Sequence, residues 1–385
     1  MPEPNDRDIE LTVRPAEDWT AVSGTWRELA ARAPDVSFFL TADWADAWME
    51  AFAGTLKPDI LLFRCGPEVV GACLLVRRRV WAGPIPLTRV YLNMSGEDDE
   101  EDTTIEYNDV LCLEERREAV AARLAAHLAA LRWDEFSARG LSGGAEAAMR
   151  QWPCFASARA SRIERSSHYV DLAAARQGSP VFDEAIGPRS RKNVRRYINL
   201  YRSSGEVRTE AAGDAGRALA MLDELIALHQ STWARRGHPG AFASPRIVGL
   251  HRGLIRRTFA SGAIQVLRVT AGDAVVGIAY NFVFRGKVYA YQQGLRYEED
   301  RRLHPGFVTT AGAVQYCMDR GLDEYDHLAG HHIDKKAIST GSRPLVWASW
   351  RRRSLATRAV DVLKRARAVA SGPAPMLRAG DEEDG

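Results

Sequence analysis

The chain is poor in cysteine, with five among 385 residues, and none of them forms a Cys-x-x-Cys pair. An odd, scattered set excludes a disulfide framework and a cysteine-based zinc site, and it indicates reduced thiols in a cytoplasmic protein. Long apolar runs are also missing, because no stretch approaches the ~18 residues typical of a membrane span. The N-terminus, MPEPNDRDIE, lacks the apolar region of a signal peptide.

No charge of one sign dominates either. Lys and Arg number 52 and Asp and Glu number 50, so the net charge of +2 provides no global field for nucleic acid, and no DNA partner is expected. Hydrophobic residues make up 46 % of the chain, and its length suffices for two domains of ordinary size. The sequence therefore predicts a globular protein that can bury its own cores.

Two parts of the chain share one order of patterns. In each, two β-rich runs flank a short glycine-containing turn, at 65–67 and again at 271–273, and the returning run carries Val-Val-Gly. Both pairs predict β-hairpins. Helix-like segments at about 115–131 and about 307–320 then each lead into a further apolar run. Hairpin, strand, helix and strand in the same order twice predict a duplicated α/β unit.

Charge is concentrated in three segments. Ser95–Asp109 carries eight carboxylates and no basic residue, which predicts a solvated loop insertion. Gly187–Gly205 carries six basic residues and no acid, with apolar residues at helical spacing, which predicts a basic helix. Arg351–Val369 has seven basic residues against one acid and predicts another basic helix, followed by a disordered end.

A strand–turn–helix segment in the second half suits an anion. A β-rich run over 287–295 is followed by Pro305 and Gly306 and then by a helical pattern. The first turn of a helix presents N–H groups without intrahelical partners and the positive end of the dipole. Gly306 leaves these amides open, and Thr309 and Thr310 add hydroxyl donors, so the segment predicts a pyrophosphate site. The alternative is an ordinary helix start with proline near the cap.

The order of motifs over about 180–340 resembles the GNAT N-acetyltransferase superfamily, in particular its BioF2-like or CelD-like (cellulose-biosynthesis-protein-like) branch. The first half matches more loosely, at Phe38-Phe39, Trp44 and Trp48. The motifs that carry the resemblance are, in chain order, the basic run within Arg189–Gly205, the LH…W…RG…F run over Leu228–Phe242, Val275-Val-Gly277, Tyr289-Ala-Tyr291, Pro305-Gly306 and Asp326…Gly330…Lys335.

This resemblance implies an α/β fold of tandem GNAT-like domains, each a mixed, mostly antiparallel twisted sheet flanked by helices. With the repeat, it implies an N-terminal half at 1–165, an acyl-CoA-binding half at 166–350, and a basic helical tail with a disordered end at 351–385. It implies acyl-CoA (acetyl-CoA) as co-substrate, no permanently bound cofactor, and a pantetheine chain between two splayed strands. The cofactor-binding residues are then Tyr289, Gln292, Pro305, Gly306, Phe307, Thr309 and Thr310.

Acyl transfer to an amine needs a proton acceptor and fixed donors at the thioester carbonyl. His331 and His332 are candidates for the base, the alternative being histidines that only hydrogen-bond within a turn. Asp326 is a candidate for orienting the substrate amine, or else a capping or pairing residue. Tyr291 could protonate the departing thiolate, although strand tyrosines usually serve packing.

On the acceptor side, His229 and Trp233 lie one turn apart in a predicted helix at about 214–235. They are candidates to line the acceptor pocket, with core packing as the alternative. Lys335 is a candidate to bind a carboxylate or phosphate, or else forms a surface ion pair.

The closing motif departs from the resemblance. Where the family often has acidic residues and tyrosine, this chain has His331, His332 and Asp334, so the acceptor stays open. No metal is expected, because His327 and His331 fall at a strand end and in a loop, without the glutamate of an HExxH helix.

Three functions follow as hypotheses. The first is an acyl-CoA-dependent N-acyltransferase acting on an amine of a small molecule, lipid or saccharide precursor. The second is a Fem-like ligase, since Fem-type proteins with two GNAT-like halves transfer amino acids from aminoacyl-tRNA, and the basic helix 189–202 would contact tRNA. The third is a non-catalytic accessory protein of polysaccharide or lipid biosynthesis. The basic segment 351–370 could contact an anionic membrane, so we expect a cytoplasmic protein with the inner membrane face as a peripheral site.

Overall fold

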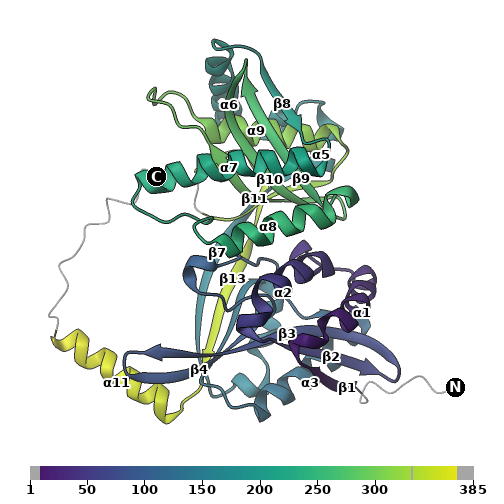
Figure 1. The fold of residues 1–385 in the computed structure, drawn as a ribbon, viewed down its shortest axis with the longest axis vertical. Coiled ribbons are helices and arrows are strands. Elements are labelled where there is room, and N and C mark those ends of the chain that lie inside the picture. Colours follow the sequence, from purple (N-terminus) through teal and green to yellow (C-terminus); the bar gives the residue numbers. More distant parts are fainter. Residues whose placement is uncertain (1–8, 331–332, 371–385) are drawn as a thin grey trace.

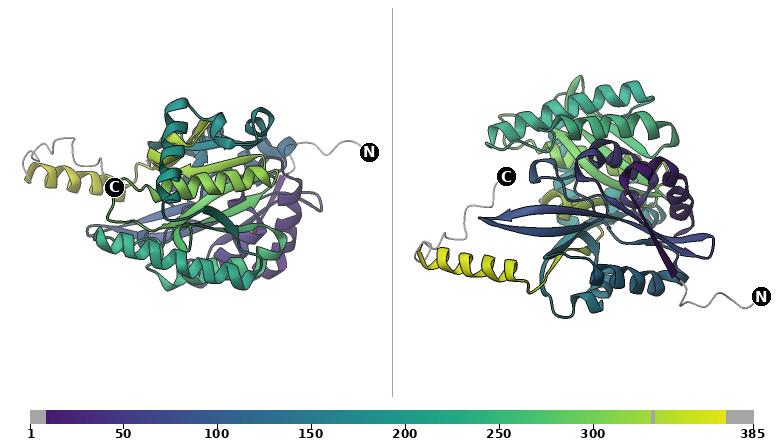
Figure 2. Two further views of the ribbon diagram at one scale, coloured as in Figure 1. Left: turned by 90° about the horizontal axis from the view of Figure 1, so that it is seen from above. Right: turned by 60° about the horizontal axis from the view of Figure 1, so that its bottom comes forward.

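A single mixed sheet runs through the whole protein in the computed structural model, which describes residues 9–330 and 333–370 (Figure 1). Twelve of its 13 strands follow the order β1-β2-β3-β4-β6-β13-β7-β12-β11-β10-β9-β8, and the short β5 pairs with β3. Helices cover both faces of this sheet (Figure 2). The strands are β1 (Ile9–Arg14), β2 (Asp59–Cys65), β3 (Glu68–Ala82), β4 (Ile85–Leu92), β5 (Leu111–Cys112), β6 (Glu135–Ser142), β7 (Arg159–Asp171), β8 (Val207–Ala211), β9 (Ile264–Ala271), β10 (Ala274–Phe284), β11 (Lys287–Leu295), β12 (Glu324–Ala329) and β13 (Gly341–Arg351).

The predicted repeat is confirmed by the topology. Hairpin β2–β3, strand β4, helix α3 and strand β6 recur as hairpin β9–β10, strand β11, helix α9 and strand β12. In both halves the last two strands run parallel, whereas the other pairings are antiparallel. The α-helices are α1 (Trp19–Arg32), α2 (Ala42–Leu56), α3 (Arg117–Ala130), α4 (Gly143–Arg150), α5 (Leu172–Gly178), α6 (Pro188–Arg202), α7 (Ala215–Arg235), α8 (Pro245–Thr258), α9 (Pro305–Asp319), α10 (Ile333–Ala337) and α11 (Leu355–Ala370).

The final strand of each half is exchanged with the other half. Strand β7 follows the first repeat in sequence but pairs with β12 of the second, and β13 follows the second repeat but pairs with β6 of the first. The two exchanged strands also pair with each other along the whole of β13. The predicted boundary at residue 165 falls inside β7, and the division into 1–165 and 166–350 stays a prediction.

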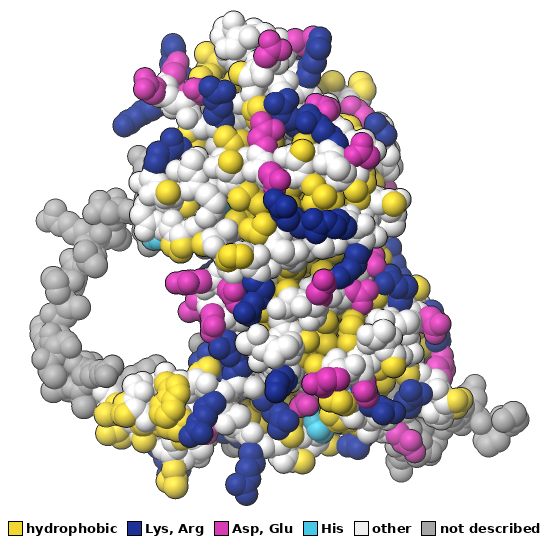
Figure 3. Space-filling model, in the orientation of Figure 1, with side chains coloured by type: hydrophobic (Ala, Val, Ile, Leu, Met, Phe, Trp, Pro, Cys, Tyr) yellow, Lys and Arg dark blue, Asp and Glu magenta, His cyan; other side chains and the backbone are white. Residues whose placement is uncertain are grey.

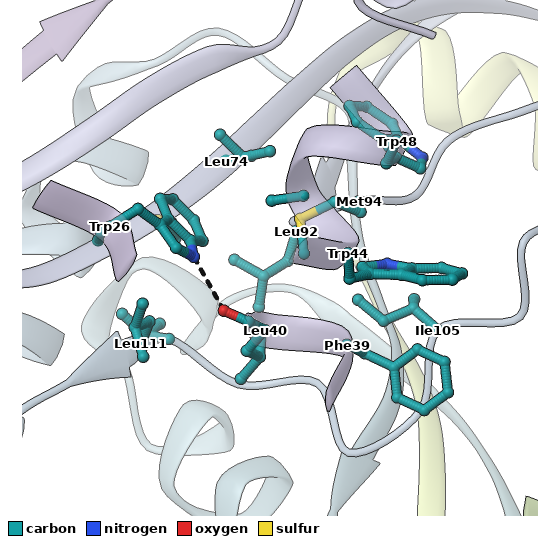
Figure 4. Packing of buried hydrophobic residues seen from close by; sticks show 14 of the residues in the cluster. Trp26, Phe39, Leu40, Trp44, Trp48, Leu74, Leu92, Met94, Ile105 and Leu111 are labelled. Atoms are coloured by element: carbon teal, nitrogen blue, oxygen red, sulfur yellow. Dashed lines mark hydrogen bonds between the residues drawn. The ribbon is translucent and has the colours of Figure 1, made fainter. Parts of the chain in front are cut away.

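The main core spans both halves. Phe38 and Trp44 of the first half contact Phe282 on β10, with ring centroids 4.5 Å apart for Phe38 and 5.6 Å for Trp44. Figure 4 shows Trp44 beside Ile105 and Phe39 within this core. Nearby, the Trp26 indole donates to the Leu40 carbonyl at 2.8 Å, which satisfies its only donor without water (Figure 4). Burial across the boundary therefore couples the stability of the two halves.

The acidic segment Ser95–Asp109 is not a solvated loop, so that prediction is wrong. Only part of it is exposed, and Ile105, Glu106 and Asn108 are buried. The reason is that this segment fills the gap where β4 and β6 diverge. Asn108 forms a parallel β-bridge with Leu141, and its backbone N–H donates to the Gly140 carbonyl at 3.0 Å. Its side-chain amide donates to the Leu92 carbonyl at 3.3 Å.

Gly140 makes this filling possible. Its φ of +64° is a conformation that glycine adopts freely, and an added Cβ at this position would meet the Ile105 carbonyl oxygen. The space that opens between the parallel strands of the first half is thus occupied by the chain itself.

Helix α11 projects from the body beside the first half (Figures 1 and 2). Val360 packs inward, whereas Leu355 is 86 % exposed. Figure 3 shows hydrophobic side chains at the lower left, where this helix and the tip of the β3–β4 hairpin overlap in the view. The predicted membrane contact through 351–370 stays a prediction. Among the helices of the described residues, none is long and apolar enough to cross a membrane.

Candidate functional site

The second half has an open splay between parallel strands. Lys287–Tyr289 of β11 pairs with Glu324–Asp326 of β12, and beyond these residues the two strands no longer pair with each other. Residues Ala290–Leu295 continue β11 along β10 on its other side. The predicted donor residues Tyr289 and Gln292 therefore lie where the splay begins and within it. Because no described strand pairs with this side of β11 beyond Tyr289, its backbone groups there can bind an extended ligand.

Helix α9 begins beside this splay, as predicted. Pro305 occupies the first position, so Gly306 and Phe307 carry the first backbone N–H groups of the helix. Tyr197 of α6 packs against this start, with its ring centroid 4.2 Å from His304 and 5.0 Å from Phe307. The geometry provides an anion site made of amides and the helix dipole.

The two predicted threonine donors face the sheet instead of the helix start. Thr309 is fully buried and its hydroxyl lies against Gly277 of β10, where any side chain on that glycine would collide with it. The Thr310 hydroxyl accepts a hydrogen bond from the Gln293 side chain at 3.1 Å. Their contact with a phosphate stays a prediction, and both hydroxyls have a packing role in this structure.

Asp326 is fully buried and fully bonded. One carboxylate oxygen accepts from Ser167 at 2.6 Å and from the Leu328 amide at 2.8 Å. The other accepts from Tyr107 and pairs with Lys287 at 2.8 Å. Burial raises the pKa of this carboxyl, but Lys287 and the hydroxyl donors outweigh burial, so the net shift in pKa is downward. All four acceptor positions are filled; a substrate amine would have to displace one of these donors.

The closing segment is described in part. His331 and His332 lie outside the described residues, so their predicted role as base stays a prediction. The preceding His327 is buried, its Nε2 is 2.6 Å from the Ile338 carbonyl oxygen, and burial lowers its pKa to about 4. Lys335 donates to the Ala329 carbonyl at 3.1 Å, which holds the predicted substrate-binding lysine at the end of β12.

Tyr291 lies at the centre of the interface between the halves. Its hydroxyl donates to the Thr103 carbonyl at 2.9 Å, and burial raises its pKa well above the usual range. A line of rings joins it to the predicted acceptor residues: His251 is 5.0 Å from Tyr291, Phe242 is 5.7 Å from His251, and His229 is 5.3 Å from Phe242. Trp233 adjoins His229 with centroids 5.9 Å apart. The structure thus brings Tyr291, His229 and Trp233 into one aromatic layer.

The acidic segment supplies carboxylates that the sequence did not assign to the site. Glu106 is 1 % exposed, and its Oε2 accepts from the Ala329 amide at 2.9 Å, so a residue of the first half reaches the end of β12. Burial, together with Asp326, raises the pKa of Glu106 to about 7, against the lowering effects of the amide and Lys335. The signal in the sequence was Ile105 and Tyr107, apolar residues that interrupt an otherwise acidic run.

The buried carboxyl of Glu106 gives a pH-dependent stability. Its pKa is about 7 when folded and 4.5 ordinarily, so the unfolded chain ionises first as pH rises. Below pH 4.5 this group does not change the free energy of unfolding. Between pH 4.5 and 7 the free energy of unfolding falls by about 3 kcal/mol in total, and above pH 7 it is constant with respect to this group. We expect Glu106→Gln to unfold at higher urea concentration than the wild type at pH 8 but not at pH 4.5. The exposed Glu100→Gln is the control, and equal shifts at both pH values would contradict the assignment.

Within the described part of the chain, no group of three or more His, Cys, Asp or Glu side chains is arranged to hold a metal ion. The expectation of no metal stays a prediction.

Comparison with known proteins agrees with this geometry. Residues 188–336 match the family model described as "Acetyltransferase (GNAT) domain". A crystal structure of FemX superposes with a TM-score of 0.55 at 11 % identity, covering 89 % of this chain and 98 % of FemX. The C-terminal domain of a putative lysylphosphatidylglycerol synthetase from Agrobacterium fabrum superposes with a TM-score of 0.51 at 12 % identity, covering 90 % of this chain and 96 % of that domain.

A conserved protein of unknown function from Bacteroides thetaiotaomicron gives a TM-score of 0.50 at 9 % identity, covering 90 % of this chain and all of that one. Among curated protein sequences, none matches this chain. At these identities the structural likeness concerns the fold alone, and the match of 188–336 to the GNAT domain supports a transferase. The BioF2-like or CelD-like branch stays a prediction.

Proposed function

We propose, given the match of residues 188–336 to the GNAT acetyltransferase domain, that the protein is an acyl-CoA-dependent N-acyltransferase. One observation carries the proposal: the splay between β11 and β12 opens directly beside the amide-bearing start of α9. An extended thiol-bearing arm and a pyrophosphate need these two features side by side. The third hypothesis, an accessory protein without chemistry, finds no specific support in this arrangement.

The donor then lies along β11. Backbone groups of Tyr289–Leu295 bind the pantetheine chain, and the amides of Gly306 and Phe307 bind the pyrophosphate, with Pro305 fixing the helix start. The side chain of Gln292 lies within this stretch and completes the predicted donor site. In the first half, the matching gap between β4 and β6 is filled by Asn108 and its neighbours. We therefore expect one donor per chain.

The chemistry needs a neutral amine and a protonated leaving group. We expect Tyr291 to give its proton to the departing thiolate after its hydroxyl has left the Thr103 carbonyl. Its raised pKa keeps the hydroxyl protonated until then. His331 or His332 is a candidate for the base. Asp326 then acts as a positioning residue, since it ties β12 to Tyr107, Ser167 and Lys287.

Calorimetry with acetyl-CoA and longer acyl-CoA thioesters tests the proposal. We expect binding of one molecule per chain, together with release of free CoA thiol when a suitable amine is added. A protein that binds no acyl-CoA would overturn the assignment, and a stoichiometry of two would contradict the filled gap in the first half.

An aminoacyl-tRNA-dependent ligase is the second candidate, favoured by a basic groove on α6. A cavity of about 620 Å³ on α6 is lined by Arg191, Lys192, Arg195 and Arg196, and the last of these also donates to the Tyr197 hydroxyl at 3.0 Å. Arg191 and Arg195 are paired with acids of the segment before α6, which leaves the groove only partly cationic. A gel shift of bulk tRNA that is lost at raised salt would favour this candidate. No shift at low salt would remove it.

A further inference from the structure

Four buried polar atoms near Tyr291 have no hydrogen-bond partner among the described residues. They are Glu97 Oε2, Trp44 Nε1, Tyr280 Oη and His251 Nδ1. The side chain of Glu97 is 4 % exposed, and the other three are still more buried. Leaving a buried polar group unpaired costs about 1–3 kcal/mol each, so native structures rarely gather several at one place.

These residues lie around the Tyr291 ring in the interface between the halves. The Tyr291 ring centroid lies 5.0 Å from His251, 6.1 Å from Trp44 and 6.1 Å from Tyr280. Glu97 joins them through Thr103, whose hydroxyl donates to Glu97 Oε1 at 2.9 Å and whose carbonyl accepts from Tyr291. The cluster contains residues of α2, the acidic segment, α8, β10 and β11, and is therefore complete only when both halves are present.

The atoms of the cluster define the chemistry of a ligand. When Glu97 is ionised, its Oε2 acts only as a hydrogen-bond acceptor, whereas Trp44 Nε1 acts only as a donor. The Tyr280 hydroxyl and the His251 ring nitrogen can donate or accept. A primary ammonium group satisfies the carboxylate, and an oxygen acceptor on the same molecule satisfies the indole. This set fits a small amine that carries a hydroxyl or carbonyl oxygen.

We propose that this cluster binds the acceptor amine, and that Glu97, in place of the candidate bases His331 and His332, holds its ammonium group and takes its proton. The inference rests on the proposed acyl-CoA function, because Tyr291 lies on the strand assigned to the donor. Trp48 fixes the carboxylate by donating to Glu97 Oε1, whereas Oε2 has no partner among the described residues and is the oxygen available to the ammonium group.

The reaction balances with the residues named. Glu97 takes one proton from the ammonium, and the free amine nitrogen attacks the thioester carbonyl to form the C–N bond. The tetrahedral intermediate collapses with cleavage of the C–S bond. The second nitrogen proton passes to the CoA sulfur, directly or through Tyr291, and the products are the N-acyl amine, CoA thiol and a proton that Glu97 releases to solvent.

The surroundings of Glu97 suit a base that works near neutral pH. Burial, supported by Asp102, raises its pKa to about 7, against the lowering effects of Trp48 and Thr103. The other titratable groups of the cluster are Tyr291, Tyr280 and His251: burial raises the pKa of both tyrosines and lowers the pKa of His251 to about 3, so none of the three carries a charge near neutral pH. Asp102 is itself paired with Arg139 at 2.7 Å. A base with a pKa near the working pH is the most effective one.

Glu97→Gln in the full chain tests this proposal, with the exposed Glu100→Gln of the same segment as matched control. The CoA-loaded protein is titrated calorimetrically with ethanolamine, 1,4-diaminobutane, glucosamine and glycinamide, and thiol release from acetyl-CoA is measured for each. We expect Glu97→Gln to keep its CoA affinity, to lose binding of the amines, and to lose about 100-fold in amine-dependent kcat. The acidic limb of kcat/KM near pH 7 should disappear in this variant only.

Two outcomes would overturn the proposal. In the first, Glu97→Gln binds and acylates the amines as the wild type does. In the second, wild-type protein with bound CoA binds none of the four amines. Wild-type protein that does not bind CoA would instead count against the proposed function. Failure of the acceptor site and failure of the proposed function are therefore distinguishable. Thermal unfolding of Glu97→Gln verifies that the variant is folded.

Discussion

Replacing Lys287 with methionine should lower the free energy of unfolding by about 3–5 kcal/mol, the usual cost of removing one partner from a buried ion pair. Lys287 Nζ lies 2.8 Å from Asp326 and 3.1 Å from Glu324, and also 3.8 Å from the centre of the Tyr107 ring. Asp326 has no exposed surface. Without the lysine, the buried Asp326 carboxylate keeps its charge but loses its counter-ion. Tyr107 and Ser167 donate hydrogen bonds to it but carry no positive charge.

Urea unfolding of Lys287→Met measures this loss. Arg302→Met is the matched control, because Arg302 pairs with Asp300 at 2.7 Å but is 77 % exposed, and exposed pairs contribute about 0–1 kcal/mol. The double variant Lys287→Met with Asp326→Asn should be more stable than Lys287→Met alone by about 1–2 kcal/mol, because the charge is removed with its partner. If the free energy of unfolding of Lys287→Met lies within about 1 kcal/mol of the wild-type value, the pair contributes no more than an exposed pair does. That result would contradict the described burial of Asp326 with Lys287.

Replacing Gly306 with glutamate should weaken acetyl-CoA binding about 100-fold, which corresponds to about 2.8 kcal/mol. A side chain at the second position of α9 covers the amides of Gly306 and Phe307, and its charge repels a pyrophosphate at the same place. The helix itself tolerates the change, since an acidic residue in the first turn interacts favourably with the dipole. Binding is measured by calorimetry.

The chain contains a matched control for this variant. Gly216 occupies the second position of α7, as Gly306 does in α9, and the same glutamate can be placed there. Gly216→Glu should bind acetyl-CoA as the wild type does. Unchanged affinity in Gly306→Glu would remove the phosphate site from the start of α9, whereas equal losses in both variants would indicate a general effect on the fold.

Local sequence patterns predicted the elements well. The strand predicted at 287–295 is β11 with the same bounds, and the predicted basic helix is α6. Alternating β-formers, a glycine turn or a proline at a helix start are decided within a few residues, so one sequence suffices to recognise them. The repeat followed from the same local signals taken in order.

The acidic segment shows where this reasoning fails. Eight carboxylates normally indicate a solvated loop, and only the shape of the gap between β4 and β6 explains why Asn108 and Glu106 are buried. The same holds for Tyr107, which bonds to Asp326 at a separation of 219 residues. Contacts across such a distance depend on the assembled sheet, and no spacing in the sequence records them. Glu97 and His251 were missed for this reason.

The exchange of β7 and β13 has a consequence for how the protein can be divided. Each half contributes the strand that completes the sheet of the other, so neither half contains all the strands of its own sheet. A chain cut to 188–336 lacks both strands, and β12 would then have an open edge where β7 pairs with it. We therefore expect a shortened chain to keep its fold only when it retains both exchanged strands, although the match to the GNAT domain lies in the second half.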